Sequence, residues 1–361
     1  MYSQNPHNNQ IWASFDCANK IDIDFAVKSA KDALNNQSWK SMTSSNRGKL
    51  LFRLADLIEN NADNIGNIEA QDSGKLLAET VSQTKYVSEY YRYFAGMADK
   101  IEGSTLPIDK QNMHVYTTHH PIGVVAAIVP WNAQMFLTAT KLAPALAAGC
   151  SVIIKASEIA PCSLFELAKL IDQAGFPEGV VSIVTGDSDN CAIPLTSHPG
   201  IDRIAFTGGM HTAKHIVRNS AENLSQVTLE LGGKSPVVVF NDARKDNAIN
   251  GIMASIFGAG GQSCIAGSRL YLHKNIYEEY LKELKTRAEA ITIGDPMSNS
   301  TQLGPLATLN QLQNIEDKIK QTLEQGGKII TGGNRINEFK KGFYFEPTIC
   351  LLYTSPSPRD G

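Results

Sequence analysis

Two side chains in the middle of the sequence have the chemistry to work as a pair. Glu230 stands directly before a Gly-Gly pair, and Cys264 ends the small-residue run 260–264, 34 residues further on. A cysteine thiolate is a strong nucleophile, and a carboxylate can transfer protons for it or for a water molecule. The adjacent glycines let the backbone approach a ligand closely. A lone Cys and a lone Glu are usually structural, so the interpretation depends on what accompanies them.

The segments around both residues carry a family resemblance. Glu-Leu-Gly-Gly-Lys-Ser-Pro at 230–236, followed by Gly-Gln-Ser-Cys at 261–264 and by Ser268-Arg269, resembles the two signatures of the NAD(P)-dependent aldehyde dehydrogenase superfamily. The resemblance extends from about residue 11 to about residue 350. It implies that Cys264 is the nucleophile and Glu230 the general base of an enzyme of class EC 1.2.1.-.

The first hundred residues predict mainly helices. Residues 1–20 are polar and predict a loop, whereas apolar residues recur at helical spacing over 22–34, 45–58 and 78–97. The tyrosines of the third helix, at 86, 90, 91 and 93, are interpreted as packing residues. Residues 103–120 alternate weakly around Pro107 and predict an extended arm or hairpin. In the resembling family, this region belongs to a bridging β-structure used in oligomer assembly.

From Pro121 onward, apolar strands alternate with helices. The predicted strands of this segment cover 122–129, 151–155, 180–184 and 204–206. The first predicted helix follows the first strand and ends at 146, and the other predicted helices cover 161–174, 190–197 and 211–222. Near-continuous apolar strands indicate burial on both faces of a parallel sheet, so we expect a doubly wound α/β domain. A strand over 235–240 and helices over 242–257, 275–290 and 308–326 begin a second α/β domain.

The predicted fold is therefore α/β and aldehyde dehydrogenase-like, with a bridging β-arm. We assign 1–102 and 122–232 to a dinucleotide-binding domain, 103–121 to the arm and 233–350 to a catalytic domain, which we expect to be incomplete. Residues 351–361, with two Ser-Pro repeats, are interpreted as a foreign tail, because they do not continue a core strand. The chain is thus expected to be a fragment that folds poorly or is inactive as written.

Pro130-Trp131-Asn132 follows the first buried strand, at the end where open α/β sheets place ligands. Asn132 offers an amide N–H, although an Asn in this position often forms only a turn. The resemblance implies that Asn132 and the backbone N–H of Cys264 form an oxyanion hole. It also places Trp131 at the cofactor.

Lys155 and Glu158 follow the second buried strand. The resemblance implies that they hold the adenosine ribose hydroxyls of the dinucleotide; the alternative is a solvated charged loop. A carboxylate at the 2′-hydroxyl would repel a 2′-phosphate, which favours NAD over NADP as the cofactor.

Phe206-Thr207-Gly208-Gly209 ends a third strand and precedes a helix, where backbone N–H groups suit a pyrophosphate. The family usually has Ser at the last of these positions and a Gly five residues after the first Gly. Here Gly209 and Ala213 stand at these positions. The resemblance adds Gly186 as another cofactor-binding glycine.

Three further observations concern the site. Lys141 matches a family position near the active site. His211 and His215 lie four apart on one helix but lack the Glu of a zincin and an evident third ligand, so no metal is assigned. By resemblance, Ala133, Leu137 and Thr140 face the substrate tunnel; none is aromatic, which disfavours a quaternary ammonium substrate.

The bulk properties exclude several classes of partner. The net charge is −3, which gives no reason to expect nucleic acid or an anionic membrane. No apolar run reaches the roughly 20 residues of a spanning helix, and the first ten residues do not resemble a secretory signal. The six cysteines are scattered without a CxxC pair, as expected for reduced thiols in the cytoplasm.

The predicted activity is NAD-dependent oxidation of an aldehyde to a carboxylic acid through a thiohemiacetal and a thioester on Cys264. The resemblance implies a homo-oligomer, a dimer or a tetramer, for the full-length protein. Transfer of the acyl group to coenzyme A is an alternative that the retained Glu230 argues against. The remaining alternative is a catalytically impaired fragment that acts only as a dinucleotide-binding or structural protein.

Overall fold

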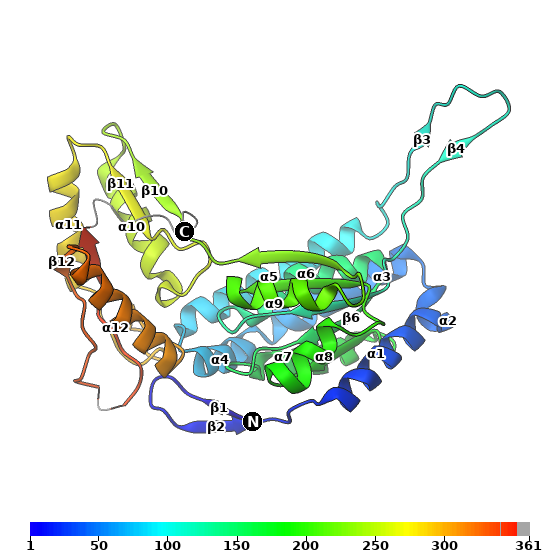
Figure 1. Ribbon diagram of the computed structural model, residues 1–361, viewed down its shortest axis with the longest axis horizontal. Helices are drawn as coiled ribbons and strands as arrows, with labels where there is room; N and C mark the ends of the chain where they lie inside the picture. The colour runs from blue at the N-terminus through cyan, green and yellow to red at the C-terminus, as the bar shows by residue number, and fades with distance from the viewer. Residues whose placement is uncertain (340, 352–361) are drawn as a thin grey trace. The chain divides into compact units, whose positions relative to one another are not determined.

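The computed structural model describes residues 1–339 and 341–351, and Figure 1 shows its helices and strands, with labels on many of them. The chain divides into two units, and each unit combines segments that are distant in sequence. The first unit comprises Met1, Phe15–Ile65 and Val81–Glu230. The second unit comprises Tyr2–Ser14, Gly66–Thr80 and the residues from Leu231 onward. The domain boundaries expected from the sequence stay a prediction. Residues 352–361 of the expected foreign tail lie outside the described residues.

A five-stranded sheet is the centre of the first unit, in the order β7-β6-β5-β8-β9. Its strands are β5 (Val124–Ile128), β6 (Ser151–Lys155), β7 (Val181–Val184), β8 (Arg203–Gly208) and β9 (Gln226–Leu231). The pairings β5–β6, β6–β7 and β5–β8 are parallel. Every residue of β5 and β6 is buried, as their apolar runs predict.

The connections of this sheet create a switch point between β5 and β8. The chain adds β6 and β7 on one side of β5 and then returns to add β8 and β9 on the other side. Ligands of open α/β sheets bind at the carboxyl ends of the strands beside such a point. The residues that follow β5 and β8 are therefore the first candidates for a binding site.

Helices cover this sheet and supply most of the apolar core of the unit. They are α1 (Lys20–Asn35), α2 (Gln37–Lys40), α3 (Ser44–Asn60), α5 (Leu77–Met97), α6 (Gln134–Ala148), α7 (Cys162–Ala174), the π-helical turn η1 (Ser188–Ala192), α8 (Ile193–Thr196) and α9 (Met210–Ser220). Helix α3 packs against α6 and α7, while α1 contacts β5, β6 and β7. Side chains of α3, α5, α6 and α7 share one cluster with Val125, Ala127, Val152 and Ile154 of the sheet.

The tyrosines of α5 do not all pack as expected. Tyr91 is fully buried, and Tyr90 is half-buried against Phe94 and Phe136. Tyr86 and Tyr93 lie beside the rings of Phe136 and Phe94 but are 59% and 62% exposed, so these two pack at the surface and not in the core. The helical spacing is correct, but one helix face alone meets the core.

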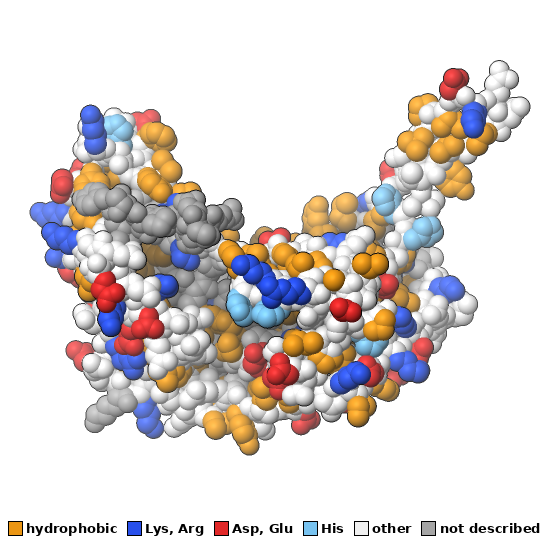
Figure 2. Space-filling view, viewed as in Figure 1, with side chains coloured by type: hydrophobic (Ala, Val, Ile, Leu, Met, Phe, Trp, Pro, Cys, Tyr) orange, Lys and Arg blue, Asp and Glu red, His pale blue; other side chains and the backbone are white. Residues whose placement is uncertain are grey.

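The predicted arm is a β-hairpin of the first unit. Strand β3 (Thr105–Leu106) pairs antiparallel with β4 (Val115–Tyr116), and the hairpin extends beyond the end of α5 (Figure 1). Every residue from 101 to 122 is exposed except Val115, which is half-buried. Apolar side chains gather along this hairpin, as Figure 2 shows.

The second unit combines short sheets with helices. Its antiparallel pairs are β1 (Tyr2–Gln4) with β2 (Ile11–Ser14), and β12 (Lys328–Thr331) with β13 (Ile349–Leu351). Strands β10 (Pro236–Val239) and β11 (Arg269–Leu272) are parallel. The helices are α10 (Lys245–Phe257), the 3₁₀ turn η2 (Gly258–Gly261), α11 (Tyr277–Glu289) and α12 (Leu309–Glu324), together with most of α4 (Ala62–Ser73).

Two parts of the sequence fold differently from expectation because polar residues are buried there. Residues 1–20 were expected to form a loop, but they contain β1 and β2, and Ser3 is fully buried with its hydroxyl donating to Asp72. Helix α4 was not expected, since it buries Glu69, Asp72 and Ser73 and so lacks a clear apolar stripe. Lys75 forms a buried ion pair with Glu69, with the Nζ and Oε1 atoms 3.1 Å apart.

Candidate active site

Asn132 and Trp131 lie where the argument from topology expects a ligand, at the carboxyl end of β5. Both are half-buried, in a bend between β5 and the first residue of α6, Gln134. Helix α6 has no side-chain cap at its N-terminus, where Ala133 is the N-cap residue. The positive end of the helix dipole favours negative charge nearby, which suits a developing oxyanion.

Lys155 and Glu158 form an ion pair at the carboxyl end of β6. Lys155 Nζ lies 2.7 Å from Glu158 Oε2; the lysine side chain is 8% exposed and the glutamate side chain 44% exposed. The buried ammonium therefore fixes a carboxylate that solvent, or a hydroxyl group of a ligand, can reach. The predicted ribose contact fits this arrangement.

Gly186, after β7, has a steric reason to be glycine. A Cβ at this position would lie 2.5 Å from Cys191 Cβ and 3.0 Å from the carbonyl oxygen of Ala18. The packing of η1 against the N-terminal segment therefore requires glycine whether or not a cofactor binds. The predicted cofactor contact of Gly186 stays a prediction.

Phe206 to Gly209 end β8 and lead into α9. Phe206 and Thr207 are buried, and the Phe206 ring lies so close to Gly208 that a Cβ there would be 2.4 Å from Cζ. Gly209 is the N-cap residue of α9, and no atom lies within 4 Å of where its Cβ would be. A ligand could therefore approach the first N–H groups of α9 closely, as the predicted pyrophosphate contact requires.

Lys141 of α6 is a buried lysine at the same end of the sheet. Its Nζ donates to Thr207 Oγ1 at 2.5 Å and lies 3.4 Å from the carbonyl oxygen of Leu137. Burial lowers the pKa of Lys141 to about 8, and the charge of Glu230 opposes this shift. Glu230, exposed on β9, thus shares an electrostatic environment with Lys141.

The lowered pKa predicts a pH dependence of stability. The unfolded chain keeps the Lys141 proton up to about its ordinary pKa of 10.5, whereas the folded chain releases it near pH 8. Because the unfolded state binds more protons between these values, the unfolding free energy should rise with pH there, by at most roughly 3 kcal/mol.

Denaturant titrations of wild type and Lys141→Met at pH 7.5, 8.5 and 9.5 measure this contribution. The unfolding free energy of wild type minus that of Lys141→Met should increase as the pH rises. A difference that is constant over this range would contradict the lowered pKa of Lys141.

Cys264 lies in the second unit, exposed in a turn between η2 and β11. The preceding residues Ala259, Gly260 and Gly261 all have left-handed backbone conformations, with φ of 52°, 64° and 70°. Glycine adopts this region readily, but an alanine there costs roughly 1–2 kcal/mol. The turn that presents Cys264 is therefore a specific conformation that other contacts must hold.

Contacts from outside the turn hold it at three points. The Glu79 carboxylate accepts the N–H of Ala259 at 2.9 Å, and Gln262 Oε1 accepts the N–H of Ala307 at 3.1 Å. After the cysteine, the Gly267 N–H donates to the carbonyl oxygen of Ser255 at 3.0 Å. Sequence reasoning missed Glu79, because no motif signals a contact across 180 residues.

The two sequence signatures also meet within the second unit. The Arg269 N–H donates to the carbonyl oxygen of Ser235, and Arg269 Nε donates to that of Lys234 at 2.9 Å. A Cβ at Gly233 would lie 3.7 Å from the carbonyl oxygen of Cys264. The Gly-Gly-Lys-Ser segment that follows Glu230 therefore runs beside the cysteine turn.

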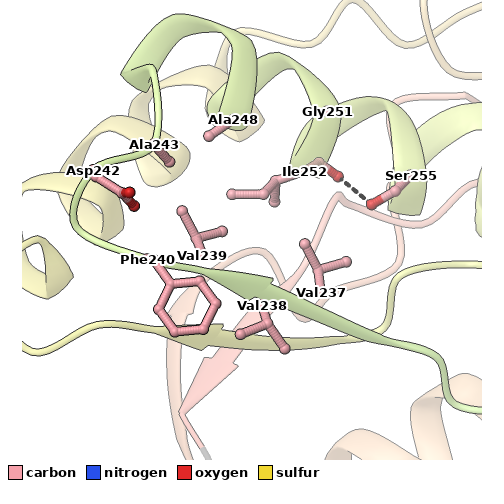
Figure 3. Close-up of a pocket in the computed structure, with 10 residues that line it drawn as sticks. All are labelled: Val237, Val238, Val239, Phe240, Asp242, Ala243, Ala248, Gly251, Ile252 and Ser255. Atoms are coloured by element: carbon pink, nitrogen blue, oxygen red, sulfur yellow. Dashed lines mark hydrogen bonds between the residues drawn. The ribbon is translucent and has the colours of Figure 1, made fainter.

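A pocket of about 430 Å³ lies between β10 and α10, and Figure 3 shows its lining. The lining is apolar apart from Asp242 and Ser255, and Ser255 Oγ donates to the carbonyl oxygen of Ile252 at 2.8 Å. None of the predicted site residues lines it. Its polar side-chain groups are the Asp242 carboxylate and the Ser255 hydroxyl, and the hydroxyl is bonded to the backbone of its own helix.

The histidines of α9 belong to a basic surface. His211, Lys214, His215 and Arg218 are exposed on this helix, and Figure 2 shows the basic and histidine side chains gathered there. The rings of His211 and His215 have centroids 4.8 Å apart. Over residues 1–339 and 341–351, no group of three or more His, Cys, Asp or Glu side chains could hold a metal ion. In the same residues, no helix has the length and apolar character that a membrane crossing requires.

Comparison with known proteins gives these residues a context. The family model described as the aldehyde dehydrogenase family matches residues 1–358. The chain is 52% identical to (Z)-2-((N-methylformamido)methylene)-5-hydroxybutyrolactone dehydrogenase of Acinetobacter baylyi. The 347 aligned residues cover 96% of this chain and 71% of that protein. The chain is 41% identical over 354 residues to an aldehyde dehydrogenase of Enchytraeus buchholzi, covering 97% of this chain and 71% of that protein.

A solved structure has the same fold. The NAD⁺ complex of an aldehyde dehydrogenase from Bacillus cereus superimposes with a TM-score of 0.94 at 38% identity, covering 97% of this chain and 71% of that one. The chain is thus shorter than these relatives. A family model that matches nearly the whole chain, together with these identities, shows that the chain belongs to the aldehyde dehydrogenase family.

Proposed function

We propose that this protein oxidises an aldehyde to a carboxylic acid with NAD and uses Cys264 as its nucleophile. The observation that carries the proposal is the position of Cys264, which is exposed and follows a turn with left-handed backbone conformations. The carbonyl oxygen of Cys264 lies against Gly233, in the segment that follows Glu230. An exposed thiol on a fixed glycine turn, with a carboxylate in the adjoining signature, supports covalent catalysis. The name of the NAD⁺ complex from Bacillus cereus supports the choice of cofactor.

The proposed reaction begins with attack of the Cys264 thiolate on the aldehyde carbonyl carbon, which forms a thiohemiacetal. The side-chain amide of Asn132 and the backbone N–H of Cys264 donate to the resulting oxyanion. NAD, when bound, supplies the acceptor for the hydride that leaves the same carbon. The product of this step is a thioester on Cys264.

Hydrolysis completes the proposed cycle. Glu230 takes a proton from a water molecule, and this water attacks the thioester carbonyl. The carbon–sulfur bond breaks, which releases the carboxylic acid and regenerates the Cys264 thiolate. Retention of the Glu230 carboxylate favours water over coenzyme A as the acyl acceptor.

The residues at the carboxyl edge of the sheet fit NAD. Glu158 presents an accessible carboxylate for ribose hydroxyls, while Gly209 leaves the first turn of α9 open to a pyrophosphate. The predicted contacts of Trp131, Lys155, Gly186, Phe206, Thr207 and Gly208 belong to the same proposal.

NAD should be preferred to NADP, because a 2′-phosphate would meet the Glu158 carboxylate. Two like charges about 4 Å apart repel by about 1–4 kcal/mol near a protein surface. The variant Glu158→Gln should therefore lower the ratio of kcat/KM for NAD over NADP by at least about 5-fold. Steady-state kinetics with both cofactors measure this ratio.

Glu166→Gln is a matched control, since Glu166 also pairs with a lysine three residues away, with the Lys169 Nζ 2.6 Å from its carboxylate. This control should leave the cofactor ratio unchanged. A wild-type protein that already prefers NADP would contradict the proposed role of Glu158.

The activity is tested by following NADH absorbance with a panel of aldehydes and by identifying the acid product by mass spectrometry. The panel includes aliphatic and aromatic aldehydes and betaine aldehyde. It also includes a 5-hydroxybutyrolactone, because the relative from Acinetobacter baylyi is named for such a substrate. We expect NADH and acid in equal amounts. NADH formation without an acid product, or no turnover with any member of the panel, would argue against the proposal.

We further propose that the protein forms a homo-oligomer, a dimer or a tetramer, through the hairpin of residues 103–121. The exposed apolar side chains of this hairpin, such as Met113 and Tyr116 at 57% and 64%, support an interface. Native mass spectrometry determines the oligomeric state.

A further inference from the structure

The turn before Cys264 needs an explanation that the reaction does not supply. Ala259 is one of the few residues other than glycine with a positive φ, and it stands five residues before the nucleophile. Non-glycine residues persist in this conformation only where their surroundings hold it. The surroundings of the Ala259 backbone therefore control the path of the turn.

Glu79 supplies the contact at this point. It lies in the first turn of α5, and its Oε1 accepts the Ala259 N–H at 2.9 Å. Its other oxygen, Oε2, is buried without a hydrogen-bond partner among the described residues. A carboxylate oxygen buried without a hydrogen-bond partner costs free energy, and each such atom in a folded protein calls for an explanation.

We propose that Glu79 is a positioning residue for the Cys264 turn, an inference that rests on the proposed function of Cys264. The hydrogen bond to Ala259 N–H fixes the left-handed start of the turn, while Gln262 fixes its middle through the N–H of Ala307. Between them, these contacts set the direction of the Cys264 thiol and of its backbone N–H. Both groups need accurate placement, because the reacting atoms must meet within a few tenths of an ångström.

A purely structural role of Glu79 makes a different prediction. A carboxylate in the first turn of a helix stabilises that helix through the helix dipole. Glutamine lacks this charge but keeps an acceptor oxygen for the Ala259 N–H, whereas methionine has a similar size and lacks both. Glu79→Gln and Glu79→Met therefore separate the hydrogen bond to the turn from the charge on the helix.

Hydrogen exchange measured by mass spectrometry on the full chain tests the inference without relying on activity. In Glu79→Met, the peptide covering 258–264 should exchange at least about 10-fold faster than in wild type, because its hydrogen-bonded start is released. In Glu79→Gln, this peptide should exchange as in wild type. Peptides from α11 and α12 should not change in either variant, and Glu89→Ala, an exposed carboxylate on the same helix, should change none of these peptides.

Kinetics give a second measurement. Glu79→Met should lower kcat by about 10-fold or more with the KM for NAD unchanged, and Glu79→Gln should restore most of the turnover. Equal effects of Gln and Met on both readouts would overturn the inference, as would unchanged exchange at 258–264 in Glu79→Met. Should wild type oxidise no aldehyde, the proposed function fails, and the exchange of residues 258–264 still decides whether Glu79 holds the turn.

Discussion

Replacing Cys264 by alanine or serine is expected to lower the turnover of NAD-dependent aldehyde oxidation by more than about 10⁴-fold. Without the thiolate no thiohemiacetal forms, so the tetrahedral carbon from which the hydride is transferred is absent. NAD binding should remain nearly intact, because the residues predicted to bind it, such as Lys155 and Glu158, belong to the first unit and Cys264 to the second. Initial rates of NADH formation and the fluorescence titration of bound NADH measure the two effects.

The matched control is Cys17→Ser. Cys17 and Cys264 are the exposed cysteines among the described residues, so both variants remove an accessible thiol. Cys17→Ser should keep wild-type turnover. Turnover above about 1% of wild type in Cys264→Ala would show that another group is the nucleophile.

Replacing Glu230 by glutamine should slow turnover by roughly 10²- to 10⁴-fold, the usual contribution of a general base. The first half of the reaction does not require this carboxylate in the proposed scheme, so NADH should still form once per active site. Stopped-flow absorbance should therefore show a burst of NADH close to one equivalent, followed by a slow steady phase. Mass spectrometry should find the acyl group on the peptide that contains Cys264.

Glu222→Gln is the control for this variant, since Glu222 is another exposed carboxylate, just after α9. It should show no burst and a normal steady rate. If Glu230→Gln instead lost the burst together with the steady rate, Glu230 would be required before the thioester forms. The assignment of Glu230 to hydrolysis alone would then be wrong.

The sheet of the first unit could be predicted because its strands are buried on both faces. Such strands consist of apolar residues in an unbroken run, and the predicted strand over 151–155 has the bounds of β6. Helices α1 and α3 were predicted from apolar residues at helical spacing, and Ile23 and Leu54, which belong to these patterns, are fully buried. Local pattern is sufficient wherever burial follows hydrophobicity.

Local pattern fails where burial involves polar side chains. Ser3 and Asp72 come from segments far apart in sequence, and each is buried because the other satisfies it. The same reason hides Glu79, whose partner Ala259 cannot be found from any spacing. The left-handed φ of Ala259 was equally unpredictable, since alanine favours helices and has no special preference for this region.

The chemistry of the candidate site stays a prediction from its residue types, and its geometry could be predicted only in part. The residue types indicate that Glu230 and Cys264 work together, and the structure adds that Arg269 binds the backbone of Lys234 and so joins the two signatures. The accessible carboxylate of Glu158 beside the buried Lys155 fits the predicted ribose contact. The tight packing around Gly186 could not be predicted, because it depends on Cys191 of a π-helical turn.

The division of the chain into units has a consequence for its synthesis on the ribosome. The second unit includes Tyr2–Ser14 and Gly66–Thr80, but their partners come late in the sequence: the Phe343 N–H donates to the carbonyl oxygen of Pro6 and the Leu77 N–H to that of Pro296. At 5–20 residues per second, Pro6 emerges roughly 20–70 seconds before Phe343 is made.

The first unit is translated in full by Glu230, so it can fold while the early segments of the second unit still lack their partners. Nascent chains should therefore pass through a state with a formed five-stranded sheet and with residues 2–14 and 66–80 unpaired. Chaperones that bind nascent chains would find their sites in these two segments. The turn that carries Cys264 would be the last part of the candidate site to be stabilised. The hydrogen bond of Ala259 requires Glu79 to be in place, and that of Gln262 requires Ala307 to have been synthesised.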